Sequence, residues 1–270
     1  MIHCEGIWWW FGVDDGDAAS LHGVRAYSSA DLVNWRDHGI VLAADHLPGC
    51  ELDSPRALVC PRTGGIVLWF HLVLPGTAGV AFAPAPGEPF VFLHGIRSDA
   101  AMTADMTILA DSNGSVWHIF RQEGDETLFA APLDESLTRH EEGAVRMATG
   151  GLCRTPVVMK WDGIYWLLAA DKAGEVLLAT GESLLSRWVI DGNPCVGSEV
   201  QMLSFFNSRP SCLVQVSEDV VILVADDGVG HHVWLPFDFS HRVPELHWQW
   251  DWAPLKKVGK DVSSRKPRLI

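Results

Sequence analysis

The stretch Asp105-Met-Thr-Ile-Leu-Ala-Asp-Ser-Asn-Gly-Ser-Val-Trp-His-Ile-Phe120 decides the fold, because it reads as two short strands joined by a tight turn. Asn-Gly and Asp-Gly between apolar, β-branched or aromatic runs are strong hairpin signals. Segments of the same kind begin at Asp53-Ser-Pro-Arg-Ala-Leu-Val, Arg154-Thr-Pro-Val-Val-Met and Arg209-Pro-Ser-Cys-Leu-Val. When Pro55, Met106, Pro156 and Pro210 are taken as equivalent, the segments recur about every 50 residues, which is typical of a β-propeller in which each repeat is one blade.

Each repeat predicts four strands, so the chain is predicted to be an all-β, five-bladed β-propeller. Blade two is expected to have strands at 55–59, 66–71, 79–83 and 90–93, and blade three at 106–109, 116–120, 127–131 and 144–147. Blade four is expected to have strands at 156–159, 164–169, 176–180 and 188–190, and blade five at 211–216, 220–224, 232–235 and 246–252. Blade one is expected at 6–11, 24–28 and 37–42, with only Met1–Cys4 before it. Blade one therefore lacks most of its inner strand, or the C-terminal segment completes it. We expect one propeller domain over residues 1–254 and a basic tail over 255–270.

The composition argues against several classes of partner. The 270 residues carry a formal net charge of −14, which disfavours nucleic acid. No apolar run reaches the length of a membrane span, and no secretion leader is visible after Met1. The six cysteines are scattered without a Cys-x-x-Cys pair, which fits reduced thiols and a cytoplasmic location. No phosphate loop or zinc pattern is present, so neither a cofactor nor a metal is expected, and the oligomeric state is left open.

Several strings resemble glycoside hydrolase family 43, particularly its exo-β-1,3-galactanase-like branch. They are Arg25-Ala-Tyr-Ser-Ser-Ala-Asp-Leu-Val-Asn-Trp-Arg-Asp-His-Gly, Pro55-Arg-Ala-Leu-Val with Thr63-Gly-Gly-Ile-Val-Leu-Trp-Phe-His71, Asp105-Met-Thr-Ile-Leu-Ala-Asp-Ser-Asn-Gly, Asn193-Pro-Cys and Val233-Trp-Leu-Pro. The resemblance extends to about Pro254. It implies a five-bladed propeller whose central funnel binds a small molecule or oligosaccharide and holds carboxylates that cleave a glycosidic bond.

The resemblance places the catalytic positions at the starts of the inner strands, and two of these positions are altered. Asp53 stands where the branch has a glutamate, and Asp105 keeps the aspartate that tunes the acid and positions the sugar. Arg154 falls on the general-acid glutamate, and Arg209 falls on the glutamine that this branch uses in place of a carboxylate base. A guanidinium stays protonated and cannot donate a proton, and losing a general acid or base costs roughly 10²–10⁴-fold in rate. We therefore expect hydrolysis by the family mechanism to be impaired.

Further residues are expected to bind the ligand. His71 matches a family histidine near the sugar, although a satisfied structural histidine is the alternative interpretation. The substrate-binding set predicted from the sequence is Trp69, His71, Arg154, Asn207 and Arg209. A metal at His231-His232 is not expected, because adjacent residues of a strand point to opposite faces.

Three interpretations of the altered funnel stay open. The arginines pair with the aspartates, Arg154 with Asp105 and Arg209 with Asp53, and only stiffen the centre. Alternatively they bind an anionic ligand, such as an acidic sugar or another acidic small molecule. In the third interpretation they stabilise negative charge on an oxygen in a repurposed cytosolic enzyme, for example an isomerase or a cycloaddition catalyst of a biosynthetic pathway. Function is thus predicted as a glycan-active or glycan-binding relative, with a small-molecule enzyme as the alternative.

Overall fold

A computed structural model describes residues 1–14, 23–49, 51–97, 102–198, 205–227 and 230–249. These residues fold almost entirely into strands, and no α-helix occurs among them. Their only helical turns are two three-residue 3-10 turns, Ala44–His46 and Phe205–Asn207. Within the described ranges, no helix is long and apolar enough to cross a membrane.

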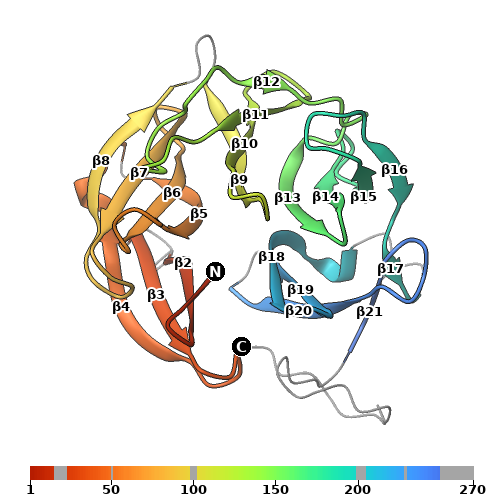
Figure 1. The fold of residues 1–270 in the computed structure, drawn as a ribbon, viewed down its shortest axis with the longest axis horizontal. Coiled ribbons are helices and arrows are strands. Elements are labelled where there is room, and N and C mark those ends of the chain that lie inside the picture. Colours follow the sequence, from red (N-terminus) through yellow and green to blue (C-terminus); the bar gives the residue numbers. More distant parts are fainter. Residues whose placement is uncertain (15–22, 50, 98–101, 199–204, 228–229, 250–270) are drawn as a thin grey trace. The chain divides into compact units, whose positions relative to one another are not determined.

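The chain divides into two compact units, each of which is considered by itself. Unit 1 comprises residues 1–30 and 34–148, and unit 2 comprises residues 31–33 and 149–270. Unit 1 contains three four-stranded sheets, and unit 2 contains one four-stranded and one five-stranded sheet. Strands that follow one another along the chain are antiparallel neighbours in these sheets, which is the construction of a propeller blade (Figure 1).

The three sheets of unit 1 are blades one to three. Blade one consists of β1 (Ile2–Cys4), β2 (Ile7–Asp14), β3 (Gly23–Ser29) and β4 (Arg36–Ala43). Blade two consists of β5 (Leu52–Val59), β6 (Ile66–Leu72), β7 (Thr77–Ala83) and β8 (Val91–Ile96). Blade three consists of β9 (Thr103–Ala110), β10 (Val116–Gln122), β11 (Leu128–Pro132) and β12 (Val145–Arg146).

The two sheets of unit 2 are blades four and five. Blade four consists of β13 (Arg154–Trp161), β14 (Ile164–Ala170), β15 (Val176–Gly181) and β16 (Val189–Gly192). Blade five consists of β18 (Arg209–Ser217), β19 (Val220–Asp226), β20 (His232–Asp238) and β21 (Glu245–His247). A fifth strand, β17 (Cys195–Val196), adds to β21 in parallel and was not predicted from the sequence.

The five predicted four-strand repeats are therefore confirmed, with ends that differ by a few residues. Blade one has an inner strand after all, but it is short: β1 has three residues, whereas β5, β9 and β13 have eight and β18 has nine. The alternative, completion of blade one by the C-terminal segment, falls on residues outside the described part of the chain, as does the predicted tail.

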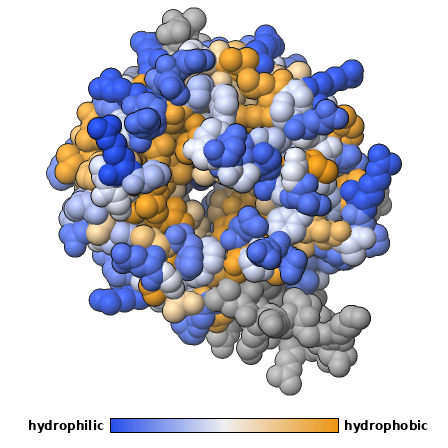
Figure 2. Space-filling model, viewed as in Figure 1, coloured by the Kyte–Doolittle hydropathy of each residue, from blue (hydrophilic) through white to orange (hydrophobic). Residues whose placement is uncertain are grey.

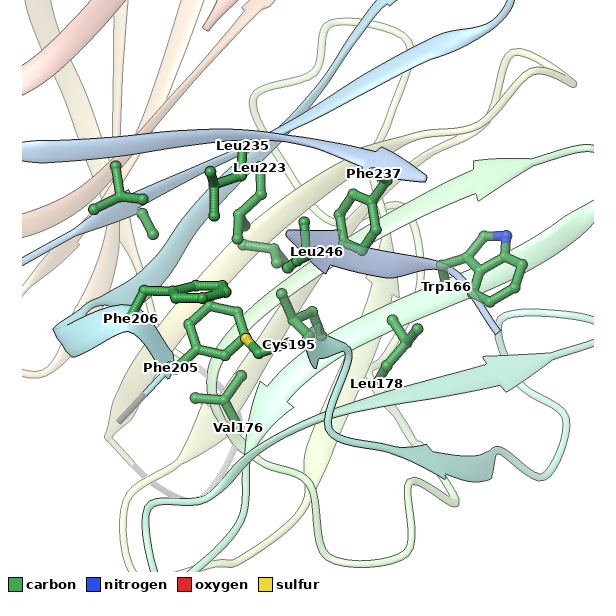
Figure 3. Close-up of a cluster of buried hydrophobic side chains, with 14 of the residues drawn as sticks. Trp166, Val176, Leu178, Cys195, Phe205, Phe206, Leu223, Leu235, Phe237 and Leu246 are labelled. Atoms are coloured by element: carbon green, nitrogen blue, oxygen red, sulfur yellow. The ribbon is translucent and has the colours of Figure 1, made fainter. Parts of the chain in front are cut away.

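The core of unit 2 lies between its two sheets. Side chains from β14 and β15 of blade four meet side chains from β19, β20 and β21 of blade five, and Figure 3 shows the packing. Two neighbouring phenylalanines, Phe205 and Phe206, belong to this cluster, and Phe205 lies next to Cys195. Burial raises the pKa of the Cys195 thiol to about 12, so this cysteine stays a neutral packing residue.

Two hydrophobic clusters of described residues in unit 1 lie on the two sides of the blade-two sheet. The first joins blades one and two, and the second joins blades two and three. Strand β6 contributes to both clusters, and all seven of its residues are buried. A strand covered on both faces loses the alternation of polar and apolar residues that marks a half-exposed strand.

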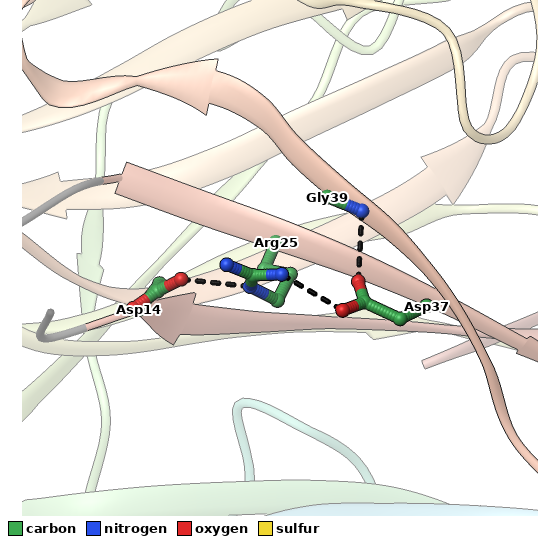
Figure 4. Close-up of polar contacts among 4 residues, drawn as sticks. All are labelled: Asp14, Arg25, Asp37 and Gly39. Atoms are coloured by element: carbon green, nitrogen blue, oxygen red, sulfur yellow. Dashed lines mark hydrogen bonds and ion pairs between the residues drawn. The ribbon is translucent and has the colours of Figure 1, made fainter.

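An ion network ties three strands of blade one together at the surface. The Arg25 guanidinium on β3 donates through Nε to Asp14 Oδ2 at 2.7 Å and through Nη1 to Asp37 Oδ2 at 2.8 Å (Figure 4). Asp37 also accepts the Gly39 N–H through Oδ1 at 2.8 Å. Asp14 is the last residue of β2 and Asp37 is the second residue of β4, so the Arg25 guanidinium links the two strands that flank β3.

Hydrophobic residues interrupt the hydrophilic surface at several points of the visible face (Figure 2). Among the described residues, the most exposed large apolar side chains on outer strands are Val91 of β8, at 66%, and Val189 of β16, at 60%. Such residues on edge strands are common singly and need no functional explanation.

Candidate functional site

The inner strands of four blades share an irregularity near their starts. The pairing register shifts by one residue between Asp53 and Arg56 in β5, beside Asp105 in β9, between Arg154 and Val157 in β13, and beside Ser211 in β18. In blades two to four the shift coincides with a residue other than glycine that has positive φ: Ser54 at 53°, Asp105 at 23° and Thr155 at 45°. A bulge of this kind re-aims side chains, and bulges are frequent beside active sites.

The bulge changes which positions correspond between blades. Asp105 is itself the bulged residue, so its structural counterparts are Ser54 and Thr155. Asp53 and Arg154 both lie one residue earlier and are still paired across the sheet, to His71 and Ala170 respectively. The predicted residues therefore all lie at or near the starts of inner strands, while the register separates Asp105 from Asp53 and Arg154.

Asp53 lies beside His71 on the neighbouring strand. The His71 Nδ1 atom is 3.1 Å from Asp53 Oδ2, and the Asp53 side chain keeps 50% of its surface exposed while His71 keeps 9%. The exposed carboxylate can meet a ligand, and the buried imidazole fixes its position. The structure thus brings these two predicted residues together.

His71 also connects blade two to blade three. Its Nε2 atom is 2.7 Å from the carbonyl oxygen of Thr103 in β9. A carbonyl and a carboxylate both only accept hydrogen bonds, so a ring that satisfies both carries a hydrogen on each nitrogen and is an imidazolium. Burial lowers the pKa of His71, but the hydrogen bond and charge of Asp53, the Thr103 carbonyl and the Asp105 charge raise it, and the net shift is upward.

Asp105 forms a close ion pair with Arg121 of β10. Arg121 donates to Asp105 Oδ2 through Nε at 2.9 Å and approaches the same oxygen through Nη2 at 2.8 Å. The two side chains are about equally shielded, with 20% and 23% of their surface exposed. The sequence analysis did not identify Arg121. The sequence does contain one indication of its role. Arg121 lies on the second strand of the hairpin that begins near Asp105, and the two strands of a hairpin place such residues close together.

Trp69 lies in the core of unit 1 and not on an accessible surface. Its side chain is fully buried, and its Nε1–H donates to the Leu137 carbonyl at 2.7 Å. Its ring packs against two histidine rings, with centroids 4.9 Å from His118 and 5.9 Å from His140. The ring therefore offers no face to a ligand, and this placement suits a structural role rather than the substrate-binding role predicted for it.

In unit 2, Arg154 and Arg209 are the first residues of β13 and β18, and both are exposed. These two inner strands are in contact with each other. Arg154 is paired across the sheet with Ala170, and Arg209 is paired with Asp226. Neither guanidinium forms an ion pair or hydrogen bond with a described residue of its unit. Of the pairs considered in the sequence analysis, Asp53 and Asp105 instead have the partners His71 and Arg121 within unit 1.

Asn207 is exposed and ends an unusual turn just before Arg209. Phe205, Phe206 and Asn207 all have positive φ, at 49°, 55° and 57°. Each such residue costs on the order of 1–3 kcal/mol unless its surroundings hold it. The two phenylalanines are buried, and Ser208 closes the turn by donating to the Phe205 carbonyl from N at 3.1 Å and from Oγ at 2.8 Å.

Metal ligands do not gather in this region. Among the residues that the structure describes, no group of three or more histidine, cysteine, aspartate or glutamate side chains is arranged to hold a metal ion. The chemistry that the described arrangement offers is therefore a half-exposed carboxylate beside a buried histidine whose pKa is raised, a carboxylate paired with arginine, and two exposed arginines.

The fold of this chain has counterparts among solved structures. No known protein family matches the sequence by its profile, and no curated protein matches it. Solved structures do match, and they show that the fold is the five-bladed β-propeller of glycoside hydrolase family 43 enzymes. The predicted fold and the predicted structural resemblance are thereby confirmed.

Three of these structures illustrate the likeness. One is a family 43 β-1,3-galactosidase with galactodeoxynojirimycin, at 24% identity and a TM-score of 0.83, covering 93% of each chain. Another is a putative exo-β-1,3-galactanase from Bifidobacterium bifidum, at 20% identity and a TM-score of 0.78, covering 92% of this chain and 89% of that one. The third is an exo-β-1,3-galactanase from Phanerochaete chrysosporium with β-1,3-galactotriose, at 20% identity and a TM-score of 0.78, covering 91% of this chain and 61% of that one.

Proposed function

We propose that this protein is a glycan-binding or glycan-active propeller in which hydrolysis by the two-carboxylate route is impaired. The fold that it shares with β-1,3-galactosidases and exo-β-1,3-galactanases supports the glycan part of the proposal. A ligand of the β-1,3-galactoside class is the first choice, because the solved structures include complexes with galactose and with β-1,3-galactotriose.

The proposal that hydrolysis is impaired rests on the residues that begin β13 and β18, which are arginines. Glycoside hydrolysis needs a group that protonates the leaving oxygen and a second group that activates water or attacks the sugar. Arg154 and Arg209 can do neither. A guanidinium does not release its protons at any working pH, and it has no lone pair with which to accept one. Both are exposed at strand starts, where the resemblance places a general acid and a glutamine.

The acidic residues of unit 1 support a role in binding the sugar. Asp53 is half exposed and held by His71, so its carboxylate can accept hydrogen bonds from sugar hydroxyl groups. Asp105 has Oδ2 taken up by Arg121, which fixes the carboxylate in one orientation. Neither aspartate needs to change protonation state for this role.

The test combines binding with turnover. We expect titration calorimetry to detect β-1,3-galactobiose, and a panel of aryl β-galactosides, arabinosides and xylosides to give slow turnover or none. Asp53→Asn should weaken binding, whereas Glu88→Gln, at an exposed carboxylate between β7 and β8 at the opposite end of the same sheet, should leave it unchanged. Absence of binding to every glycan, or fast turnover that survives both Asp53→Asn and Asp105→Asn, would contradict the proposal.

A second candidate is a non-hydrolytic enzyme that acts on a small anionic or polarised ligand. The exposed guanidinium of Arg154, which is paired across its sheet with an alanine, favours it. Fixed positive groups stabilise charge that develops on an oxygen during an isomerisation or cyclisation. A flat glycoside panel together with micromolar binding of a phenolic or carboxylate compound would favour this candidate over the first.

A further inference from the structure

We propose that the starts of β13 and β18 form a carboxylate-binding subsite, in which Arg154 binds the carboxylate of a sugar acid. This inference rests on the proposed glycan-binding function and names the class of glycan. All residues that carry it belong to unit 2. It uses two inner strands that contact each other and that both begin with an exposed arginine.

The cross-strand partners separate the roles of the two arginines. Arg209 and Asp226 are opposite each other in the β18–β19 pair, and Asp226 is opposite His232 in the β19–β20 pair. Arg209 therefore lies directly across from an acidic residue, Asp226, on the neighbouring strand. Arg154 is opposite Ala170, and Ala170 is opposite Val176, so neither of the residues aligned with Arg154 across the sheet is acidic. The positive charge of Arg154 is thus the one left for a ligand.

Local backbone structure shapes both strand starts from which the arginines project. The register shift after Arg154, with Thr155 at φ 45°, sets the direction in which the start of β13 presents its first residue. The left-handed turn Phe205–Asn207 precedes Arg209, and its two buried phenylalanines anchor it in the core of unit 2. Asn207, which ends this turn, is exposed and lies two residues before Arg209.

The guanidinium selects the ligand chemistry. Its planar fork matches the two oxygens of a carboxylate, and such paired hydrogen bonds are stronger than those between neutral groups. On a glycan, a carboxylate comes from a sugar acid such as a uronic acid. A neutral hexose offers only hydroxyl groups, which do not compensate the charge of Arg154.

The experiment compares D-galacturonic acid with D-galactose by titration of the intact protein. We expect galacturonic acid to bind about tenfold or more tightly, and the difference to shrink when the salt concentration is raised from 0.05 M to 0.5 M. Benzoic acid, a carboxylate without a sugar, should bind much more weakly than galacturonic acid. Equal binding of benzoic and galacturonic acid would overturn the sugar-acid assignment.

Variants assign the preference to a residue. Arg154→Ala should reduce galacturonic acid affinity by roughly 10- to 100-fold and leave galactose affinity unchanged, with Arg154→Lys intermediate because it keeps the charge but loses the fork. Arg209→Ala should have a smaller effect. Arg187→Ala, at an exposed arginine of blade four just before β16, is the matched control and should change nothing.

The outcomes distinguish this inference from the function on which it rests. Equal affinity for galactose and galacturonic acid would overturn the carboxylate subsite and leave glycan binding standing. An unchanged preference in Arg154→Ala, with the fold verified by its thermal unfolding midpoint, would also overturn it. Failure of galactose, β-1,3-galactobiose and galacturonic acid alike to bind would overturn the proposed function itself.

Discussion

Arg121 holds Asp105 through two nitrogen atoms that reach the same carboxylate oxygen, Nε at 2.9 Å and Nη2 at 2.8 Å. Asp105 is at the bulge of β9 with φ at 23°, a backbone conformation that an aspartate tolerates better than most residues. The ion pair therefore stabilises an unusual backbone position as well as a charge. Asp105 and its charged partner Arg121 belong to neighbouring strands of the same blade.

Arg121→Ala should lower the free energy of unfolding by about 1–3 kcal/mol, because it leaves a mostly shielded carboxylate without its charged partner. Urea denaturation at neutral pH measures the effect. The matched control is Arg146→Ala in the same blade, whose ion pair with Asp125 is longer, at 3.4 Å, and leaves Arg146 64% exposed. Exposed pairs contribute roughly 0–1 kcal/mol. Equal losses in the two variants would contradict a special role for the Arg121–Asp105 pair.

The charge of His71 should make stability depend on pH above 6.5. Its folded-state pKa is raised above the ordinary value of 6.5, so its contribution is fully present below pH 6.5 and is lost as the pH rises through the folded pKa. We expect the free energy of unfolding of the wild type to fall across this window. His71→Gln should be less stable at pH 6 and should show a flatter profile above it. An identical slope in wild type and variant would show that His71 is neutral in the folded protein.

His118 should produce the opposite dependence on the acid side. It is fully buried, with Nδ1 3.0 Å from His140 Nε2, and burial followed by the charge of neighbouring histidines lowers its pKa well below 6.5. A histidine that must stay neutral contributes stability above its unfolded pKa of about 6.5, and this is lost as the pH falls below that value. His118→Phe should remove that part of the acid-side loss. If the variant loses stability below pH 6.5 as steeply as the wild type, other groups account for the loss.

Trp69→Phe should separate packing from ligand binding. The substitution removes the hydrogen bond from Nε1 to the Leu137 carbonyl and leaves a small cavity, so we expect a loss of about 1–3 kcal/mol in the free energy of unfolding. Ligand affinity, measured by calorimetry at a temperature where the variant is folded, should not change. A tenfold weaker binding without loss of stability would restore the substrate-binding role predicted from the sequence.

The sequence was sufficient for the blades because turns such as Asp111-Ser-Asn-Gly recur between apolar runs at a fixed spacing. It was not sufficient for the partners of the site residues. Those partners depend on register, and a bulge at Asp105 or after Arg154 shifts the register by one residue without a glycine to mark it. The positions of Arg121 beside Asp105 and of Asp226 opposite Arg209 follow from the strand pairing. The burial of Trp69 was hidden for a different reason, because β6 is covered on both faces and has no alternation to read.

The last prediction concerns a double variant that replaces both arginines. Arg154→Glu together with Arg209→Gln would place a proton donor at the start of β13 and recreate at β18 the glutamine of the resembling branch. If the arginines are what impairs hydrolysis, turnover of aryl β-galactosides should rise by roughly 10²-fold or more, the usual worth of a positioned general acid. The rise should depend on Arg154→Glu, since Arg209→Gln alone supplies no acid. Arg187→Glu adds the same charge to blade four at a distant strand and should leave turnover unchanged. If the double variant folds, binds galactosides as the wild type does and still fails to turn them over, the arginines are not the cause, and the loss of hydrolysis would have to be traced to the shortened acid at Asp53.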